Sequence, residues 1–256
     1  MTTVTRAIGH GVGRITLNRP DRMNAISVEL GGELERAILD VGTDPGVNLV
    51  VIRGAGGNFC AGGDFDEVQR LRSGGPEALA PLFDGFRRAC DAIASIEVPV
   101  VAAVEGVAMA GGFELMQAAD IVLVSDEARI ADNHINFGMI PGGGSTQRLP
   151  RLVGRQNALG MLLSGDRLSG VEAVRCGLAY RSFPQADFDD GVQRFVATLA
   201  QRQRTAVTAI KRLVYSSVEH AAPTGLDNEI TAVVAHISGR DGARGVAAFG
   251  QRGARP

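Results

Sequence analysis

The sequence predicts an α/β fold in which short buried strands alternate with amphipathic helices. Valine-rich apolar runs of strand length, each bounded by Gly, Pro, Asp or Asn, recur at residues 14–18, 47–54, 98–106, 120–126 and 177–183. Helical patterns separate these runs, and only helical patterns follow residue 187. Strands that alternate with helices are expected to be joined by right-handed crossovers.

The first strand, residues 14–18, is followed by a predicted helix over residues 27–40. Ser27 is a suitable N-cap, and one helix face is apolar, with Leu30, Leu34 and Ile38. After the second strand, residues 77–96 repeat the helical spacing with Leu79, Phe83, Phe86, Cys90 and Ile93. The segment 64–76 ends in Ser-Gly-Gly-Pro and is predicted to be a mobile loop.

The C-terminal part of the chain is predicted to be helical. Helical patterns cover residues 188–202, 205–221 and 224–237, and residues 241–256 resemble a short helix with a basic end. We therefore divide the chain into a core of residues 1–186 and a C-terminal helical region of residues 187–256. Such a region serves either as an oligomerisation element or as a cover for the core.

Composition argues against several classes of protein. The net charge of −2 lacks the basic excess of a nucleic-acid binder. There is no apolar run of about 18 residues to suggest a membrane span, and the first ten residues lack the apolar segment of a secretory signal. Cys60, Cys90 and Cys176 are scattered without metal-ligand spacing, so we expect a cytoplasmic protein without a metal. Lys211 is the only lysine, so any phosphate must be bound by arginine or backbone amides.

Two glycine-rich turns follow predicted strands, at residues 54–64 and 105–120. Neither contains the G-x-G-x-x-G dinucleotide fingerprint, and the chain has no P-loop motif. Gly111 and Gly112 begin a predicted helix, whose first amides are free and carry partial positive charge. One amide from each turn would form an oxyanion hole. Glu114, in the first turn of this helix, either complements the helix dipole or takes part in the chemistry.

Six stretches, taken in order, resemble the crotonase (enoyl-CoA hydratase/isomerase) superfamily. They are residues 17–27, 57–65, 98–126, 135–154, 162–183 and 245–252. The resemblance implies a crotonase-like spiral of ββα units with a C-terminal helical trimerisation region, assembled as a homotrimer or a dimer of trimers. It also implies an acyl-CoA thioester as the ligand and no separate cofactor, since coenzyme A is part of the substrate. In the absence of other information, the resemblance implies a role in fatty-acid metabolism.

The resemblance also assigns roles to individual residues. The backbone amides of Gly63 and Gly111 match the oxyanion hole that polarises the thioester carbonyl and stabilises the enolate. Glu114 matches the first catalytic glutamate of the hydratases. The positions that match contacts to coenzyme A are Arg22, Cys60, Ala61 and Asp64, together with Phe249 and Arg252, which in relatives reach a neighbouring subunit's ligand. One departure is Asp66, which stands where relatives often carry a lysine near the phosphates.

The second catalytic glutamate of the hydratases is replaced by His134, seven residues before Pro141. Hydration needs a base to activate water at C3 and an acid to protonate C2, and an imidazole with an ordinary pKa of about 6.5 suits such work. Three interpretations of His134 stay open: a proton donor, a residue that lines the acyl pocket, and a structural histidine. Asp132 and Asn136 flank it and are candidates to orient the ring.

The predicted function is hydration of a 2-enoyl-CoA to a 3-hydroxyacyl-CoA. Double-bond isomerisation and hydrolysis of a thioester or β-diketone are alternatives within the same superfamily. In relatives that isomerise with one glutamate, that glutamate often stands at the position of His134, which favours hydration here. The negative net charge and the retention of Glu114 disfavour a non-catalytic acyl-CoA binder or an RNA binder.

Overall fold

The computed structural model describes residues 2–218 and 220–253, with side chains described up to residue 250. The largest sheet has the order β1-β2-β3-β4-β6-β8. Its strands are β1 (Val4–Gly9), β2 (Val12–Leu17), β3 (Leu49–Gly54), β4 (Val100–Val104), β6 (Ile121–Ser125) and β8 (Arg181–Phe183). β1 is antiparallel to β2, and all later pairings are parallel. A second, two-stranded parallel sheet joins β5 (Val107–Met109) to β7 (Arg129–Ala131).

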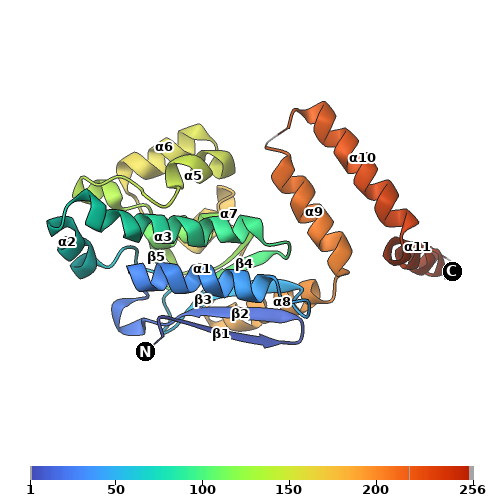
Figure 1. The fold of residues 1–256 in the computed structure, drawn as a ribbon, viewed down its shortest axis with the longest axis horizontal. Helices are drawn as coiled ribbons and strands as arrows, with labels where there is room; N and C mark the ends of the chain where they lie inside the picture. Colours follow the sequence, from blue (N-terminus) through green and yellow to red (C-terminus); the bar gives the residue numbers. More distant parts are fainter. Residues whose placement is uncertain (1, 219, 254–256) are drawn as a thin grey trace.

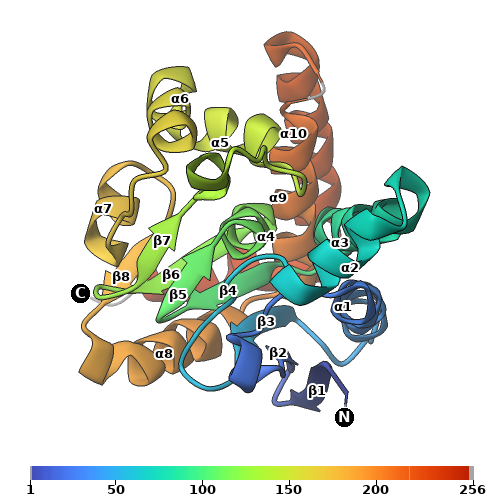
Figure 2. The same cartoon turned by 90° about the vertical axis from the view of Figure 1, so that its left-hand side faces the viewer.

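The helices lie on both faces of the large sheet and beyond it (Figures 1 and 2). The α-helices are α1 (Val28–Gly42), α2 (Phe65–Ser73), α3 (Pro76–Ser95), α4 (Gly111–Ala118), α5 (Ser145–Val153), α6 (Arg155–Ser164), α7 (Gly170–Arg175), α8 (Phe188–Ala200), α9 (Arg204–Ser216), α10 (Ala222–Ser238) and α11 (Arg240–Gly253). Short 3-10 helices are η1 (Pro20–Arg22), η2 (His134–Phe137) and η3 (Gln185–Asp187).

The sheet separates two apolar clusters because alternate side chains of a strand point to opposite faces. Val50 and Ile52 of β3 pack into the larger cluster, with side chains from α1, α3 and α4. Leu49 and Val51 of the same strand pack into the smaller cluster, with Phe188, Val192 and Val196 of α8. The first helix after residue 187 is therefore packed against the sheet.

The predicted α/β class is confirmed. Four of the apolar runs contain β3, β4, β6 and β8, and the run 14–18 overlaps β2, which begins two residues earlier. β1 was not predicted. It is an edge strand whose central residues are exposed, so it lacks an apolar pattern. β5 and β7 are only three residues long each. The apolar face predicted for residues 27–40 is confirmed, with Leu30, Leu34 and Ile38 fully buried in α1.

Two predictions along residues 64–96 were wrong in part. Residues 65–73 form α2 rather than a loop, because Asp64 caps the helix by accepting a hydrogen bond from the Glu67 amide at 3.2 Å. This helix buries no residue, so it shows no apolar stripe. On α3, Phe83 is 40% exposed and Leu82 is buried instead. The Phe83 ring lies against the backbone of Gly142, where an added Cβ would come within 2.6 Å of it.

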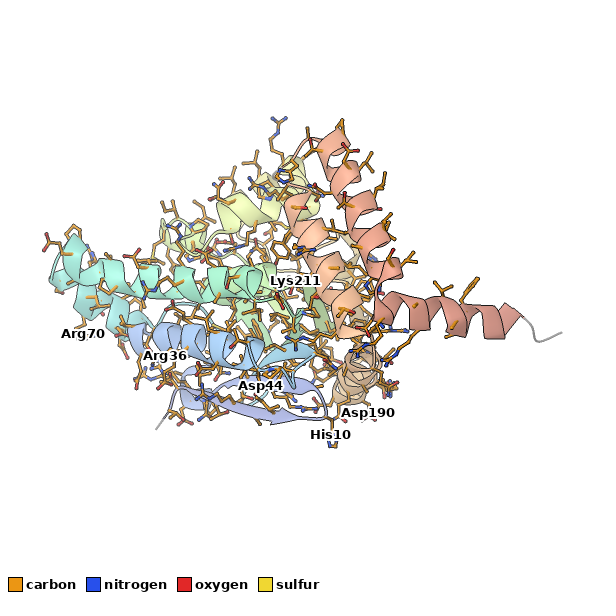
Figure 3. The ribbon with its side chains drawn as sticks, turned by 45° about the vertical axis from the view of Figure 1, so that its right-hand side comes forward. His10, Arg36, Asp44, Arg70, Asp190 and Lys211 are labelled. Atoms are coloured by element: carbon orange, nitrogen blue, oxygen red, sulfur yellow. The ribbon has the colours of Figure 1, made fainter. Side chains whose placement is uncertain are left out.

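The C-terminal helices α9, α10 and α11 extend away from the sheet (Figure 1). Neither α9 nor α10 contains a buried residue among those described, although both carry apolar side chains. One contact from α9 to the core is made by Lys211, which lies where α9 approaches the end of α3 (Figure 3). Within the described residues, none of the helices has the length and apolar character needed to cross a membrane.

Candidate active site

The two glycine-rich turns predicted from the sequence are joined edge to edge. The Cys60 amide donates to the Val107 carbonyl at 2.9 Å, and the Met109 amide donates to the Cys60 carbonyl at 3.0 Å. Gly62 has φ +106, and an added Cβ there would lie 2.8 Å from the Ala110 Cβ. Only glycine allows this backbone conformation together with so close an approach. The sequence therefore brings the turns before α2 and before α4 into direct contact.

The amides of Gly63 and Gly111 are free at this junction. In the described part of the chain, neither donates a backbone hydrogen bond, whereas the next amide after Gly63 is used: the Asp64 amide donates to the Ile26 carbonyl at 2.8 Å. Gly111 is the first residue of α4, so its amide carries the partial positive charge of a helix N-terminus. Ala110 enters the helix with a positive φ of 48°, a strained conformation of the kind found at functional sites. The two predicted oxyanion-hole amides therefore have no hydrogen-bond acceptor among the residues described. They lie close to the place where the two glycine-rich turns contact each other.

Glu114 projects from the first turn of α4 and is only 2% exposed. Its Oε1 accepts hydrogen bonds from the amides of Gly143, at 2.7 Å, and Ser145, at 3.1 Å. Gln117, one turn further along α4, donates to the Ser145 hydroxyl at 2.9 Å and supports this loop from behind. The backbone of the glycine-rich segment before α5 therefore binds and orients the Glu114 carboxylate.

The environment of Glu114 tunes its basicity. Burial raises the pKa of Glu114, and the Ser145 amide, the charge of His134 and the Gly143 amide only partly offset it. A carboxylate whose pKa lies above the ordinary range is a better proton acceptor near neutral pH. Glycine is needed at position 143, since an added Cβ would lie 2.3 Å from Phe86 Cε1 and 2.9 Å from Glu114 Oε2.

His134 begins η2, and its ring Nδ1 lies 2.6 Å from Oδ1 of Asp132. Burial lowers the pKa of His134, but the hydrogen bond and charge of Asp132, with the charge of Glu114, raise it above its ordinary value. Glu114 and His134 each act on the pKa of the other, so they belong to one electrostatic site. Of the two flanking candidates, Asp132 contacts the ring, whereas the Asn136 amide faces the Gly165 carbonyl at 3.5 Å.

Comparison with known proteins decides the family. The model of the enoyl-CoA hydratase/isomerase family matches residues 7–255. The chain belongs to this family. A probable enoyl-CoA hydratase of Mycobacterium leprae is 32% identical over 239 residues, which cover 93% of this chain and 91% of the relative.

Relatives that are named for different activities share this similarity. A peroxisomal Δ3,5-Δ2,4-dienoyl-CoA isomerase of Arabidopsis thaliana is 30% identical over 226 residues, covering 84% of this chain and 81% of the relative. The crystal structure of an enoyl-CoA hydratase from Polaromonas sp. JS666 matches with a TM-score of 0.93 at 28% identity, covering 97% of each chain. The predicted crotonase-like fold is confirmed, and this member of the enoyl-CoA hydratase/isomerase family is an enzyme.

The residues that the family resemblance assigns to coenzyme A lie around the turn before α2. Ala61 donates its amide to the Met23 carbonyl at 3.0 Å, which places η1 beside this turn. Cys60 is fully buried, and both its amide and its carbonyl are already hydrogen-bonded, to Val107 and Met109. Arg22 is exposed but pairs with Asp66 at 2.8 Å.

Asp64 has a different environment from the other three positions. It caps α2 and forms an ion pair with Arg19 at 2.7 Å, with its side chain only 8% exposed. Burial would raise the pKa of Asp64, but the Arg19 hydrogen bond and the Glu67 amide lower it below the ordinary range. Asp64 therefore fixes the shape of the turn. Arg19 could not be found from the sequence, because it is 45 residues away from Asp64 in the chain.

The two C-terminal candidates lie far from α2 in the same chain. α11 and α2 stand at opposite ends of the long axis (Figure 1). Phe249 on α11 is 80% exposed. The side chain of Arg252 lies outside the described residues. Any contact of Phe249 with the site near α2 therefore requires another copy of the chain.

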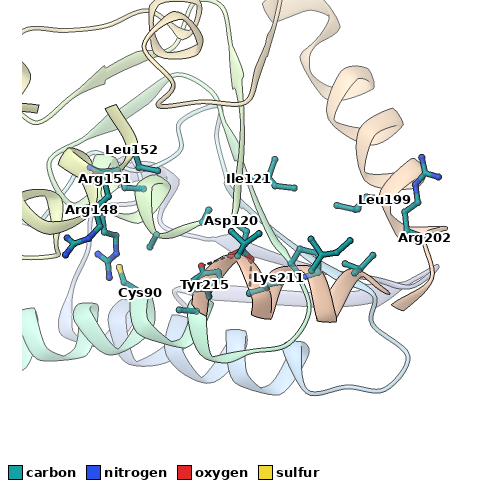
Figure 4. Close-up of a pocket in the computed structure, with 18 of the residues that line it drawn as sticks. Cys90, Asp120, Ile121, Arg148, Arg151, Leu152, Leu199, Arg202, Lys211 and Tyr215 are labelled. Atoms are coloured by element: carbon teal, nitrogen blue, oxygen red, sulfur yellow. Dashed lines mark hydrogen bonds and ion pairs between the residues drawn. The ribbon is translucent and has the colours of Figure 1, made fainter. Parts of the chain in front are cut away.

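A cavity of about 960 Å³ separates α9 from the core, and Glu114 and His134 do not line it (Figure 4). On its floor, Lys211 Nζ donates to Asp120 Oδ2 at 2.8 Å and to the carbonyls of Ile93, at 2.8 Å, and Val98, at 3.0 Å. The Tyr215 hydroxyl donates to the other Asp120 oxygen at 2.6 Å. All three ammonium protons have acceptors, so Lys211 ties α9 to the core and is unsuited to Schiff-base chemistry.

The described residues contain no group of three or more His, Cys, Asp or Glu side chains arranged to hold a metal ion.

Proposed function

We propose that this enzyme adds water across the C2–C3 double bond of a 2-enoyl-CoA thioester and forms the 3-hydroxyacyl-CoA. The observation that carries the proposal is the pairing of two proton-transfer groups, Glu114 and His134, beside the free amides of Gly63 and Gly111. Hydration uses two such groups, whereas isomerisation of a double bond can run on one. The names of the relatives, most of them enoyl-CoA hydratases, support the same substrate class.

In the proposed reaction, the thioester carbonyl oxygen accepts hydrogen bonds from the amides of Gly63 and Gly111. These amides stabilise the negative charge that develops on that oxygen. Glu114 removes a proton from water, and the resulting hydroxyl forms a bond to C3 while the π electrons move toward the enolate oxygen. His134, as the imidazolium, then protonates C2 as the enolate collapses. The cycle closes when Glu114 releases its proton and His134 regains one.

Purified enzyme and crotonyl-CoA provide the direct test, with loss of the conjugated-thioester absorbance as the signal. Rapid loss that Glu114→Ala and His134→Ala both abolish is the expected result. Loss abolished only by Glu114→Ala would make His134 a pocket residue. No loss with wild-type enzyme that still binds the thioester would overturn hydration and direct the search to isomerase and hydrolase substrates.

The Arg22–Asp66 pair predicts how tightly the phosphates of coenzyme A are held. Asp66→Asn is expected to lower the KM for crotonyl-CoA about 1.5- to 5-fold with kcat unchanged, because an exposed ion pair contributes about 0.2–1 kcal/mol and its loss frees Arg22. Steady-state kinetics at low salt measure the effect. The control substrate is crotonyl-pantetheine, which lacks the phosphates. An equal change in KM for both thioesters would contradict this role of Arg22.

We propose a homotrimer or a dimer of trimers, built through α9, α10 and α11. The support is apolar surface that the single chain leaves uncovered, at Ile210, Val214, Leu226, Ile230, Val233, Val234 and Ile237. Exposed patches of this kind mark protein interfaces. Sedimentation is expected to give the mass of three or six chains, and a monomer mass at micromolar concentration would rule this assembly out.

We also propose a cytoplasmic enzyme without a cofactor, a membrane partner or a nucleic-acid partner. The three cysteines are free, which suits a reducing compartment. The chemistry proposed above needs only the thioester, water and groups of the protein.

A further inference from the structure

Asp132 is an unusually placed carboxylate beside the candidate site. It follows β7 directly and is 1% exposed. Its Oδ1 lies 2.6 Å from the His134 ring Nδ1 and 3.4 Å from the His134 amide nitrogen. In the part of the chain that the structure describes, its Oδ2 has no hydrogen-bond partner. A buried carboxylate with one unpaired oxygen is costly unless a positive charge compensates it.

We propose that Asp132 is a positioning residue that keeps His134 as an imidazolium and leaves Nε2 as its only proton-exchanging nitrogen. The proposal rests on the proposed function in assigning that proton to C2 of the substrate. Because Asp132 occupies Nδ1, the tautomer and rotation of the ring are fixed from behind. The carboxylate takes no part in the reaction itself and acts through the histidine.

The distance and the burial of the pair favour charge on both partners. A contact of 2.6 Å lies at the short end for a nitrogen donor, and charge-assisted N–H···O hydrogen bonds, at about 2.7–2.9 Å, are the short ones. The His134 side chain is 14% exposed and that of Asp132 is 1% exposed, so water screens their attraction weakly. Among the described residues, the Asp132 carboxylate has no other cation within ion-pair distance.

The charges that act on the His134 ring all favour the imidazolium. Two charged groups act on the ring, Asp132 after β7 and Glu114 on α4. Both raise the pKa of His134, whereas burial lowers it. α6 packs beside η2 but contributes no charge that acts on the ring. An ordinary imidazole, with a pKa of about 6.5, is mostly neutral above pH 7. Asp132 thus makes a histidine usable as an acid where the hydratases carry a glutamate.

Asp132→Asn separates charge from shape, because the amide oxygen still accepts a hydrogen bond from Nδ1–H. The expected result is a drop of about 1–3 units in the pKa of His134, measured by NMR titration of the ring. The alkaline limb of the kcat profile is expected to move to lower pH by the same amount. The imidazolium is the active form, so kcat falls about tenfold for each unit by which the pKa drops below the assay pH.

Asn136→Ala is the matched control, since Asn136 shares η2 with His134 but does not contact its ring. It is expected to leave both the ring pKa and the pH profile unchanged. Asp132→Glu restores the charge and is expected to recover part of the alkaline limb. If the KM of Asp132→Asn changes by less than about threefold while kcat falls, the substitution has impaired proton donation and not thioester binding.

The outcomes distinguish this inference from the proposed function. An unchanged ring pKa in Asp132→Asn overturns the inference, whatever the activity. A lowered pKa with an unmoved alkaline limb in an active enzyme also overturns it. A lowered pKa in an enzyme that hydrates no enoyl-CoA leaves Asp132 as the partner of His134 and refutes the hydratase. If Asp132→Asn does not fold, NMR titration of the wild-type protein still tests the inference. The pKa of His134 must then lie above about 6.5, and a lower pKa overturns the inference.

Discussion

Glu114→Gln is expected to lower kcat for crotonyl-CoA hydration by about 10²–10⁴-fold, the contribution of a general base. Glutamine keeps the size of the side chain, and its carbonyl oxygen can still accept the amides of Gly143 and Ser145. Its amide group cannot take a proton from water. Binding of the thioester depends on other groups, so KM is expected to change little.

The comparison for Glu114→Gln is Glu127→Gln, which makes the same chemical change at an exposed position. This control is expected to match wild-type kcat, and both variants are expected to unfold at the wild-type temperature. A fall of less than tenfold in Glu114→Gln would show that Glu114 serves the helix dipole rather than the reaction. That was the alternative left open by its place in the first turn of α4.

The wild-type pH profile should reflect both groups. The pKa of Glu114 is raised, chiefly by burial, and the base must be ionised, so activity is lost as the pH falls through that raised value. The pKa of His134 is also raised, and the acid must be protonated, so activity is lost as the pH rises through it. A bell-shaped profile of kcat follows, with coupled limbs that belong to the pair.

The sequence was informative where function depends on local chain geometry. The glycine pairs before α2 and α4 predicted close backbone approach, and the structure places these turns in contact. Gly111 at a helix start predicted a free amide for the same local reason. The valine-rich runs predicted β3, β4 and β6 because a parallel strand buried on both faces is apolar almost throughout.

Contacts between distant segments could not be predicted in this way. The amides that hold Glu114 come from residues 29 and 31 positions later, and no spacing rule connects them to α4. His134 stayed open between three interpretations because its role depends on which neighbour reaches the ring. The chain turns into η2 at His134, and this turn brings Asp132 to Nδ1 and takes Asn136 away.

Asp120→Ala is expected to lower the free energy of unfolding by about 3–5 kcal/mol, the usual effect of breaking a buried ion pair. The side chains of Asp120 and Lys211 are only 10% and 8% exposed. Removing the carboxylate leaves the ammonium of Lys211 on the floor of the cavity under α9 with carbonyl acceptors alone, and the Tyr215 hydroxyl loses its acceptor (Figure 4). Urea unfolding measures the loss.

The double variant Asp120→Ala/Lys211→Met tests whether the unpaired charge causes this loss. Replacing the ammonium with an apolar side chain removes the buried charge, so the double variant is expected to be more stable than Asp120→Ala alone. Asp227→Ala on α10 is the control, because an exposed carboxylate of this kind changes stability by less than about 0.5 kcal/mol. If Asp120→Ala resembles this control, the Asp120–Lys211 pair does not hold α9 to the core. If the double variant is the less stable one, the lost contacts matter more than the stranded charge.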